Sequence, residues 1–180
     1  MFDHVERELG PLDALVNNAG IVAAPQPLAE MELTRLTRMF EVNVLGAYLC
    51  AREAARRLPT DRGVAAAARS SMSPRWPRGS ARRTNMSTTP APRAPSTRSR
   101  WAWPRNSRHT AVRVNAVRPG LIDTEIHASG GQPDRAARLG AQTPIGRRAA
   151  PTRVAEAIVW LLGDAASYVT GTLVDVGGGR

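Results

Sequence analysis

The chain has 180 residues, a formal net charge of +10 and one cysteine, Cys50. A single cysteine excludes a disulfide framework, and no apolar run approaches the length of a membrane span. No charged-then-apolar leader opens the sequence. These features predict a soluble, cytoplasmic protein with no membrane partner and no metal site, and the length suffices for a sizeable core.

The positive charge is concentrated in one segment. Residues 62–110 contain 11 arginines and no acidic residue, whereas the rest of the chain holds 14 arginines against 15 acidic residues. All basic residues are arginine, and lysine is absent from the sequence. Outside this segment the charge balance is that of an ordinary enzyme, so the net charge alone does not indicate nucleic-acid binding.

The first block, residues 1–61, predicts a helix, a strand, a turn and a long helix. Residues 2–9 form an amphipathic run, and the apolar residues of 12–16 have the length and branching of a buried strand. The small and amide residues that follow predict a tight turn at the carboxyl end of that strand, where open α/β sheets bind ligands. Helical spacing of apolar residues then predicts one long helix over residues 30–58.

The last block, residues 111–180, is again well patterned. Residues 112–117 predict a strand that ends at Arg118-Pro119-Gly120. An amphipathic helix is expected over residues 151–162, and a last strand over residues 172–176.

The middle segment, residues 62–110, differs from both blocks. It contains no Leu, Ile or Phe, but six of the 14 prolines and three of the four tryptophans. It has no sustained period of 2 or 3.6, and its apolar surface is too small to offset the entropy of ordering. The sequence therefore predicts a disordered Arg/Pro/Ser-rich insert between two structured blocks.

Four motifs resemble, in order, those of the short-chain dehydrogenase/reductase family. Leu-Asp-Ala-Leu-Val-Asn-Asn-Ala-Gly at 12–20 is similar to the strand-four signature, and Phe-Glu-Val-Asn-Val-Leu-Gly at 40–46 to a helix with an active-site asparagine. Val-Arg-Val-Asn-Ala-Val-Arg-Pro-Gly at 112–120 resembles strand six, and residues 167–179 resemble the last turn and strand. The resemblance implies an α/β fold, an incomplete Rossmann-type doubly wound parallel sheet, and hydride transfer between NAD or NADP and a small-molecule alcohol or ketone.

The resemblance also implies the site residues. Asn43 matches the catalytic asparagine that positions a proton-relay water. Cofactor contacts are implied for Asn17, Asn18, Ala19, Gly20, Pro119, Gly120, Ile122 and Thr124. Structural alternatives stay open: the turn at 17–20 can serve tight packing, Asn43 can interrupt a helix, and Thr124 or Asp123 can cap the next helix. Residues 126–149, in the substrate loop, carry no pocket signature.

Two parts of the family's machinery are missing from the sequence. The family uses a serine, a tyrosine as general acid–base, and a lysine four residues later that lowers the tyrosine's pKa. Without lysine this dyad cannot exist; Tyr48, with Arg52 four residues on, is expected in the core. The family's first strand and glycine-rich turn, which receive the pyrophosphate, would precede Met1. The sequence therefore predicts an N-terminally truncated chain that is inactive as written and binds dinucleotide weakly or not at all.

The middle segment is interpreted as the family's coding sequence read out of frame. In the shifted frame, each codon consists of the last base of one codon and the first two bases of the next. In that frame Trp101-Ala102 can encode only glycine, and Trp103-Pro104 can encode only alanine. That pattern is similar to the helix after the family's lysine. The same frame permits Asn-Val-Ser-Ser across residues 71–75, a tyrosine at Thr88-Thr89 and a lysine at Pro92-Arg93, four positions apart.

Two other functions stay open. The Arg-rich segment, with Trp76, Trp101 and Trp103, has the charge and aromatic side chains to bind RNA or single-stranded DNA, although such runs usually lack a nucleic-acid partner. Alternatively, the chain is a non-catalytic subunit of an oligomer. The family associates through the helix of Asn43 and the helix after the lysine, and the second of these is missing from the sequence.

Overall fold

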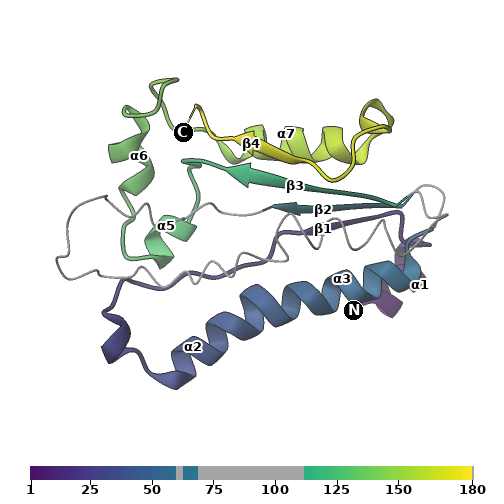
Figure 1. Cartoon of the computed structure of the whole chain (residues 1–180), viewed down its shortest axis with the longest axis horizontal. Coiled ribbons are helices and arrows are strands. Elements are labelled where there is room, and N and C mark those ends of the chain that lie inside the picture. Colours follow the sequence, from purple (N-terminus) through teal and green to yellow (C-terminus); the bar gives the residue numbers. More distant parts are fainter. Residues whose placement is uncertain (60–62, 69–111, 180) are drawn as a thin grey trace.

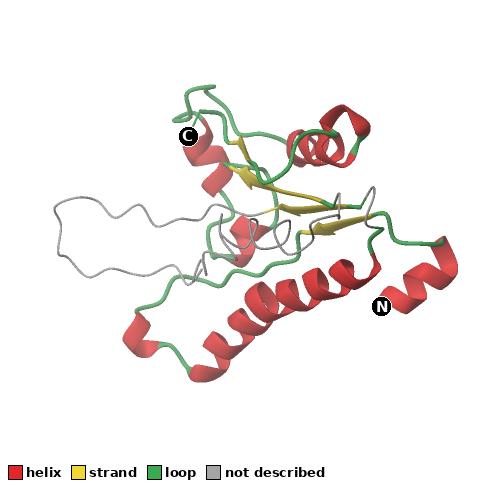
Figure 2. Ribbon diagram, turned by 45° about the vertical axis from the view of Figure 1, so that its right-hand side comes forward, coloured by secondary structure: helices red, strands yellow, loops and turns green. Residues whose placement is uncertain are grey.

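The computed structural model describes residues 1–59, 63–68 and 112–179. Its strands all pair in parallel and lie in chain order, as β1 (Ala14–Asn17), β2 (Val64–Ala68), β3 (Arg113–Pro119) and β4 (Leu173–Val176). Figure 1 shows α3 on one side of this sheet and α7 on the other, and Figure 2 shows the same layers from a second direction. A parallel sheet with helices on both faces confirms the predicted α/β, Rossmann-type fold.

The two amphipathic helices have the bounds expected from their patterns, α1 (Phe2–Leu9) and α7 (Pro151–Leu162). The long helix predicted over residues 30–58 is instead divided into four parts: η1 (Leu28–Glu30), α2 (Leu33–Phe40), the π-helix η2 (Glu41–Gly46) and α3 (Ala47–Arg57). Two short helices follow β3, namely α5 (Ile126–Ser129) and α6 (Arg135–Gly140), and η3 (Asp164–Ala166) follows α7. Within the described ranges, no helix is long and apolar enough to cross a membrane.

Strand β2 corrects the prediction for the start of the middle segment. Val64 pairs with Ala14 of β1 on one side and with Arg113 of β3 on the other, so the strand separating these two is present. The pattern missed it because alanine is depleted in strands. A central parallel strand is nevertheless stabilised by backbone hydrogen bonds on both edges. Three predictions concern residues outside the described ranges. They are the disorder of residues 69–110, the role of Trp76, Trp101 and Trp103, and the candidate codon junctions.

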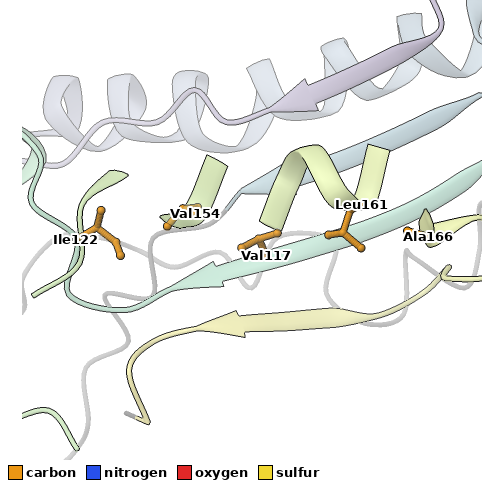
Figure 3. Close-up of a cluster of buried hydrophobic side chains, with 5 residues drawn as sticks. All are labelled: Val117, Ile122, Val154, Leu161 and Ala166. Atoms are coloured by element: carbon orange, nitrogen blue, oxygen red, sulfur yellow. The ribbon is translucent and has the colours of Figure 1, made fainter. Parts of the chain in front are cut away.

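Alternate residues of β3 face two separate cores. Val114 packs toward α3, in a cluster with the buried residues Ala54, Leu58 and Val112. Val117 packs toward α7, and Figure 3 shows it with the other buried members of that cluster: Ile122, Val154, Leu161 and Ala166. The period of 2 in β3 therefore places the two helical layers on opposite faces of the sheet.

Polar residues of β3 fix α7 and the loop after it. Arg113 donates from Nη1 to the Leu161 carbonyl (2.5 Å) and from Nη2 to the Leu162 carbonyl (3.1 Å). A cation at this position complements the carboxyl end of the helix dipole. Asn115 is buried; it donates from Nδ2 to the Val169 carbonyl (2.9 Å) and accepts from the Thr172 N–H (3.2 Å).

Tyr48 is not a core residue, contrary to the prediction. Its side chain is half exposed on α3. With 3.6 residues per turn, the buried stripe of this helix passes through Ala54 and continues to Leu58, and Tyr48 lies off that stripe.

Candidate active site

An open hollow lies at the carboxyl edge of the sheet, where the ends of all parallel strands meet. It has a volume of about 290 Å³ and is lined by Gly20, Ile21, Val22, Glu125, Ile126 and Ser129. The first three follow β1 and the last three follow β3, and Figure 1 shows α5 beyond the arrowheads of the strands. Ligands of open α/β sheets bind at this edge, so the hollow is the candidate active site.

Asn43 binds the loop after β1, which forms one wall of the hollow. Its Oδ1 accepts the Ile21 N–H (2.8 Å), and its Nδ2 donates to the Ile21 carbonyl (2.9 Å). A Cβ on Gly20 would lie 3.3 Å from the same Oδ1, so the loop passes closely over the amide. Asn43 lies within the π-helical turn η2, and such turns are rare in proteins and frequent at functional sites.

The predicted turn at residues 17–20 divides into a structural and an exposed part. Asn17 donates from Nδ2 to the Ala47 carbonyl (2.8 Å), which joins the end of β1 to the start of α3. Asn18, Ala19 and Gly20 are exposed at the carboxyl edge. The packing alternative therefore fits Asn17, and a ligand can reach the three residues after it.

The start of the loop after β3 is fixed by contacts within the chain. Pro119 pairs with Val176 of β4, and Gly120 donates its N–H to the Val176 carbonyl (3.0 Å). A Cβ on Gly120 would lie 2.6 Å from the Cα of Gly177, closer than real Cβ atoms approach. Close packing of two backbones accounts for this glycine.

Ile122 and Thr124 have different surroundings in this loop. The Ile122 side chain is buried in the core beneath α7, so any ligand contact must come from its backbone. Thr124 is exposed. Neither Thr124 nor Asp123 caps α5, contrary to the structural alternative, because Glu125 is the N-cap and its side chain makes no capping bond. The Asp123 carboxylate instead lies 3.2 Å from Nε of Arg148.

Sequence reasoning missed Glu125, His127 and Ser129, which shape the other wall. Glu125 and Ser129 are four residues apart and therefore lie on one face of the helical turn, toward the hollow. His127 is buried, and its Nε2 lies 2.8 Å from the Ile122 carbonyl, which makes Nε2 the protonated nitrogen. The spacing of Glu125 and Ser129 just after a strand end was the available signal, but α5 is too short to show a period.

Charged groups with shifted pKa values lie at the far end of α3, away from the hollow. Burial raises the pKa of Glu53, but the hydrogen bond from Arg52 and the charges of Arg56, Arg52 and Arg57 outweigh it, so the pKa falls below its ordinary value of 4.5. Hydrogen bonds to Asp3 and Glu6 raise the pKa of Arg57. In the described part of the chain, no group of three or more His, Cys, Asp or Glu is placed to hold a metal ion.

The parallel sheet with helices on both faces defines a Rossmann-type α/β protein, and the hollow lies at the strand ends, where this class of fold binds its ligands. A family model described as enoyl-(acyl carrier protein) reductase matches residues 1–180. The chain belongs to the short-chain dehydrogenase/reductase family, whose members are NAD(P)-dependent oxidoreductases, and this confirms the resemblance of the four motifs.

Relatives and solved structures agree with this assignment. The chain is 37% identical to the uncharacterized oxidoreductase YgfF of Escherichia coli (strain K12) over 192 residues, covering 100% of the chain and 72% of that protein. It is 37% identical over 179 residues to cis-4-hydroxycyclohexanecarboxylate dehydrogenase of Sinomonas cyclohexanicum, covering 99% and 70%. A 7 alpha-hydroxysteroid dehydrogenase, solved with NADH and 7-oxo glycochenodeoxycholic acid, has a TM-score of 0.79, 28% identity, and coverage of 98% and 67%. These oxidoreductases give the nucleic-acid alternative no support.

Proposed function

We propose that this chain forms the substrate side of an NAD(P)-dependent site for small alcohols or ketones, and that the 180-residue chain does not complete the reaction. The observation that carries the proposal is the hollow at the carboxyl edge of the parallel sheet. One wall is the loop that Asn43 holds through Ile21, and the other is the turn that presents Glu125.

The exposed residues of the site fit the nicotinamide end of a dinucleotide. Asn18, Ala19 and Gly20 are small or amide residues at the strand end, and Thr124 offers an exposed hydroxyl in the loop after β3. Ile122 is assigned a backbone contact, because its side chain is in the core. A bound NAD or NADP supplies or accepts the hydride. The dehydrogenase solved with NADH supports this cofactor class.

Asn43 is assigned a positioning role. Both polar atoms of its side chain are engaged by the backbone of Ile21, so the amide holds the loop and is not free to exchange a proton with substrate. Proton transfer therefore needs another group in the hollow.

The chain offers no tyrosine–lysine pair for that proton transfer. Tyr48 is half exposed on α3, Tyr168 is fully exposed in the loop before β4, and neither lines the hollow. The sequence contains no lysine. Arginine does not replace it, because a guanidinium spreads its charge over a planar fork. These facts support an inactive chain.

We propose that a shifted reading frame in the middle segment removed the dyad. The family's serine, tyrosine and lysine would fall between β2 and β3, in the segment where the codon junctions permit all three in one shifted frame. The segment's composition, with 11 arginines and no acidic residue, supports the same proposal.

Association with a second copy is proposed through α2, η2 and α3. Large apolar side chains are half exposed along this continuous helical run: Phe40, Leu45, Tyr48 and Leu49. Apolar surface of this kind marks protein contacts. Light scattering of the purified chain tests the proposal, with a dimer expected and a monomer contradicting it.

Turnover is tested by incubating the purified chain with NADH or NADPH and small ketones such as cyclohexanone, and by following the absorbance of the reduced nicotinamide. The expected rate equals that of the protein-free control. A thermal melt in the same solutions is expected to show little shift with either cofactor. Substrate-dependent oxidation that disappears in Asn43→Ala would overturn the proposed inactivity.

A further inference from the structure

We infer that the hollow discriminates against anionic substrates and takes small neutral or cationic hydroxy compounds with an apolar body, and that Glu125 sets this selectivity. The inference rests on the proposed function, because it assumes that the hollow receives the substrate. It names the chemistry of that substrate from the side chains that line the hollow.

The lining combines an apolar surface with two polar side chains. Ile21, Val22 and Ile126 supply apolar surface, and Glu125 and Ser129 supply a carboxylate and a hydroxyl. A volume of about 290 Å³ is at the lower end of the range for small-molecule sites. The hollow therefore suits a compact apolar body whose polar groups meet one acidic and one hydroxyl side chain.

Among the residues that the structure describes, no cation pairs with the carboxylate of Glu125. Neither an ion pair nor a side-chain hydrogen bond is formed by Glu125 within the described part of the chain, and no basic residue lines the hollow. The nearby Arg148 is paired with Asp123, and Arg118 with Asp175. From the described residues alone, an anionic group entering the hollow would be repelled by the carboxylate of Glu125, whereas a cation or a hydroxyl would gain a partner.

The orientation of Glu125 and Ser129 is held by the buried side of the turn. The Ser129 N–H donates to the Glu125 carbonyl (3.0 Å), so the two residues belong to one helical turn. Between them, His127 is buried with its Nε2 at 2.8 Å from the Ile122 carbonyl, and the His127 carbonyl accepts the Gln132 N–H (2.8 Å). These bonds fix the backbone of the turn that carries Glu125 and Ser129, the two polar residues in the lining of the hollow.

Three probes of one shape and different charge test the inference. Cyclohexane-1,4-diol is neutral, 4-aminocyclohexanol is cationic and cis-4-hydroxycyclohexanecarboxylate is anionic at neutral pH. Their dissociation constants are measured by NMR titration of the whole chain at low salt, without turnover. The amine is expected to bind about fivefold more tightly than the diol, and the carboxylate about fivefold more weakly. The Sinomonas dehydrogenase, named for the carboxylate, is the positive control for that probe.

Two variants separate charge from shape. Glu125→Gln is expected to bring the three dissociation constants together, because it removes the charge and keeps the size. Glu156→Gln is the matched control: it removes an equal charge from the exposed surface of α7 and is expected to keep the order of the probes. Ser129→Ala is expected to weaken all three probes alike, by about threefold.

Equal affinities in the unmodified chain, tighter binding of the carboxylate, or an order unchanged by Glu125→Gln would overturn the inference. Binding of none of the probes would overturn it as well. The proposed inactivity is judged separately by nicotinamide oxidation, so active enzyme with the expected probe order would contradict that proposal and leave this inference standing.

Discussion

The two faces of the sheet are covered to different extents. Beneath α7, Val117, Leu161 and Ala166 are completely buried in one cluster. In the described part of the chain, the buried cluster on the α3 side has fewer members, and the helical run from α2 to α3 leaves several large apolar side chains half exposed. Both faces carry polar links, from Arg113 to the end of α7 and from Asn17 and Asn43 on the α3 side, so the described faces differ chiefly in their apolar packing.

The largest effect is expected from truncating a core leucine beneath α7. Leu161→Ala removes a side chain with no exposed surface and should lower the free energy of unfolding by about 4 kcal/mol. Leu58→Ala, in the α3 cluster, should cost about 2 kcal/mol because that cluster is smaller. Urea denaturation of both variants measures the difference. Leu33→Ala is the control, with a 77% exposed side chain and an expected change near zero; equal losses for Leu161 and Leu58 would contradict the comparison.

The next effect concerns the contact between the ends of β3 and β4. Gly120→Ala would place a Cβ 2.6 Å from the Gly177 Cα, and relieving this clash should cost about 2 kcal/mol. Gly163→Ala is the control, because its Cβ would lie 3.6 Å from the nearest atom, an ordinary contact. Denaturation midpoints of the two variants provide the test, and an unchanged midpoint for Gly120→Ala would refute the close approach.

A smaller effect is expected from the polar link on the α3 side. Asn43→Ala leaves the N–H and carbonyl of Ile21 without their partner and should cost about 1.5 kcal/mol. Hydrogen exchange of the Ile21 amide should accelerate in this variant. Asn18→Ala, at an exposed position in the same loop, should leave the exchange unchanged. If both variants behave alike, the loop is held by other contacts.

The smallest effect is a pH dependence at the end of α3. The pKa of Glu53 is lowered in the folded chain, so its stabilising contribution is complete above pH 4.5 and is lost as the pH falls through the folded-state pKa. Thermal melts between neutral and acidic pH should show this loss, and Glu53→Gln should flatten it. Glu30→Gln, on the exposed turn η1, is the matched control for the removal of one carboxylate.

The sequence predicted the parts of the fold in which local pattern and packing agree. The helical spacing of apolar residues predicted both ends of α1 and α7. Apolar runs predicted the bounds of β1, β3 and β4 to within one or two residues. It missed β2, because four of its five residues are alanines, which are depleted in strands, and the strand is held by neighbours from distant parts of the chain. It also missed the π-helical turn around Asn43, because the apolar spacing predicted one continuous helix through residues 41–46.

The candidate site was predictable only in its outline. The motifs placed Asn43 and the turn at 17–20 at the edge of the sheet, but not the bonds that divide Asn17 from its exposed neighbours. The spacing of Glu125 and Ser129 was too weak a signal to assign them to a site, because the hollow forms only when the loops after β1 and β3 come together. Tertiary contact, not local sequence, assigns these two side chains to the site.

We propose that the walls of the site are present and that its proton-transfer pair was lost to a shift of reading frame. The nucleotide sequence that encodes residues 62–110 tests it most directly. The expected result is that the codon junctions spell tyrosine at Thr88-Thr89, lysine at Pro92-Arg93 and serine within residues 71–75, all in one shifted frame. Third bases that spell other residues at the tyrosine and lysine junctions would contradict the claim.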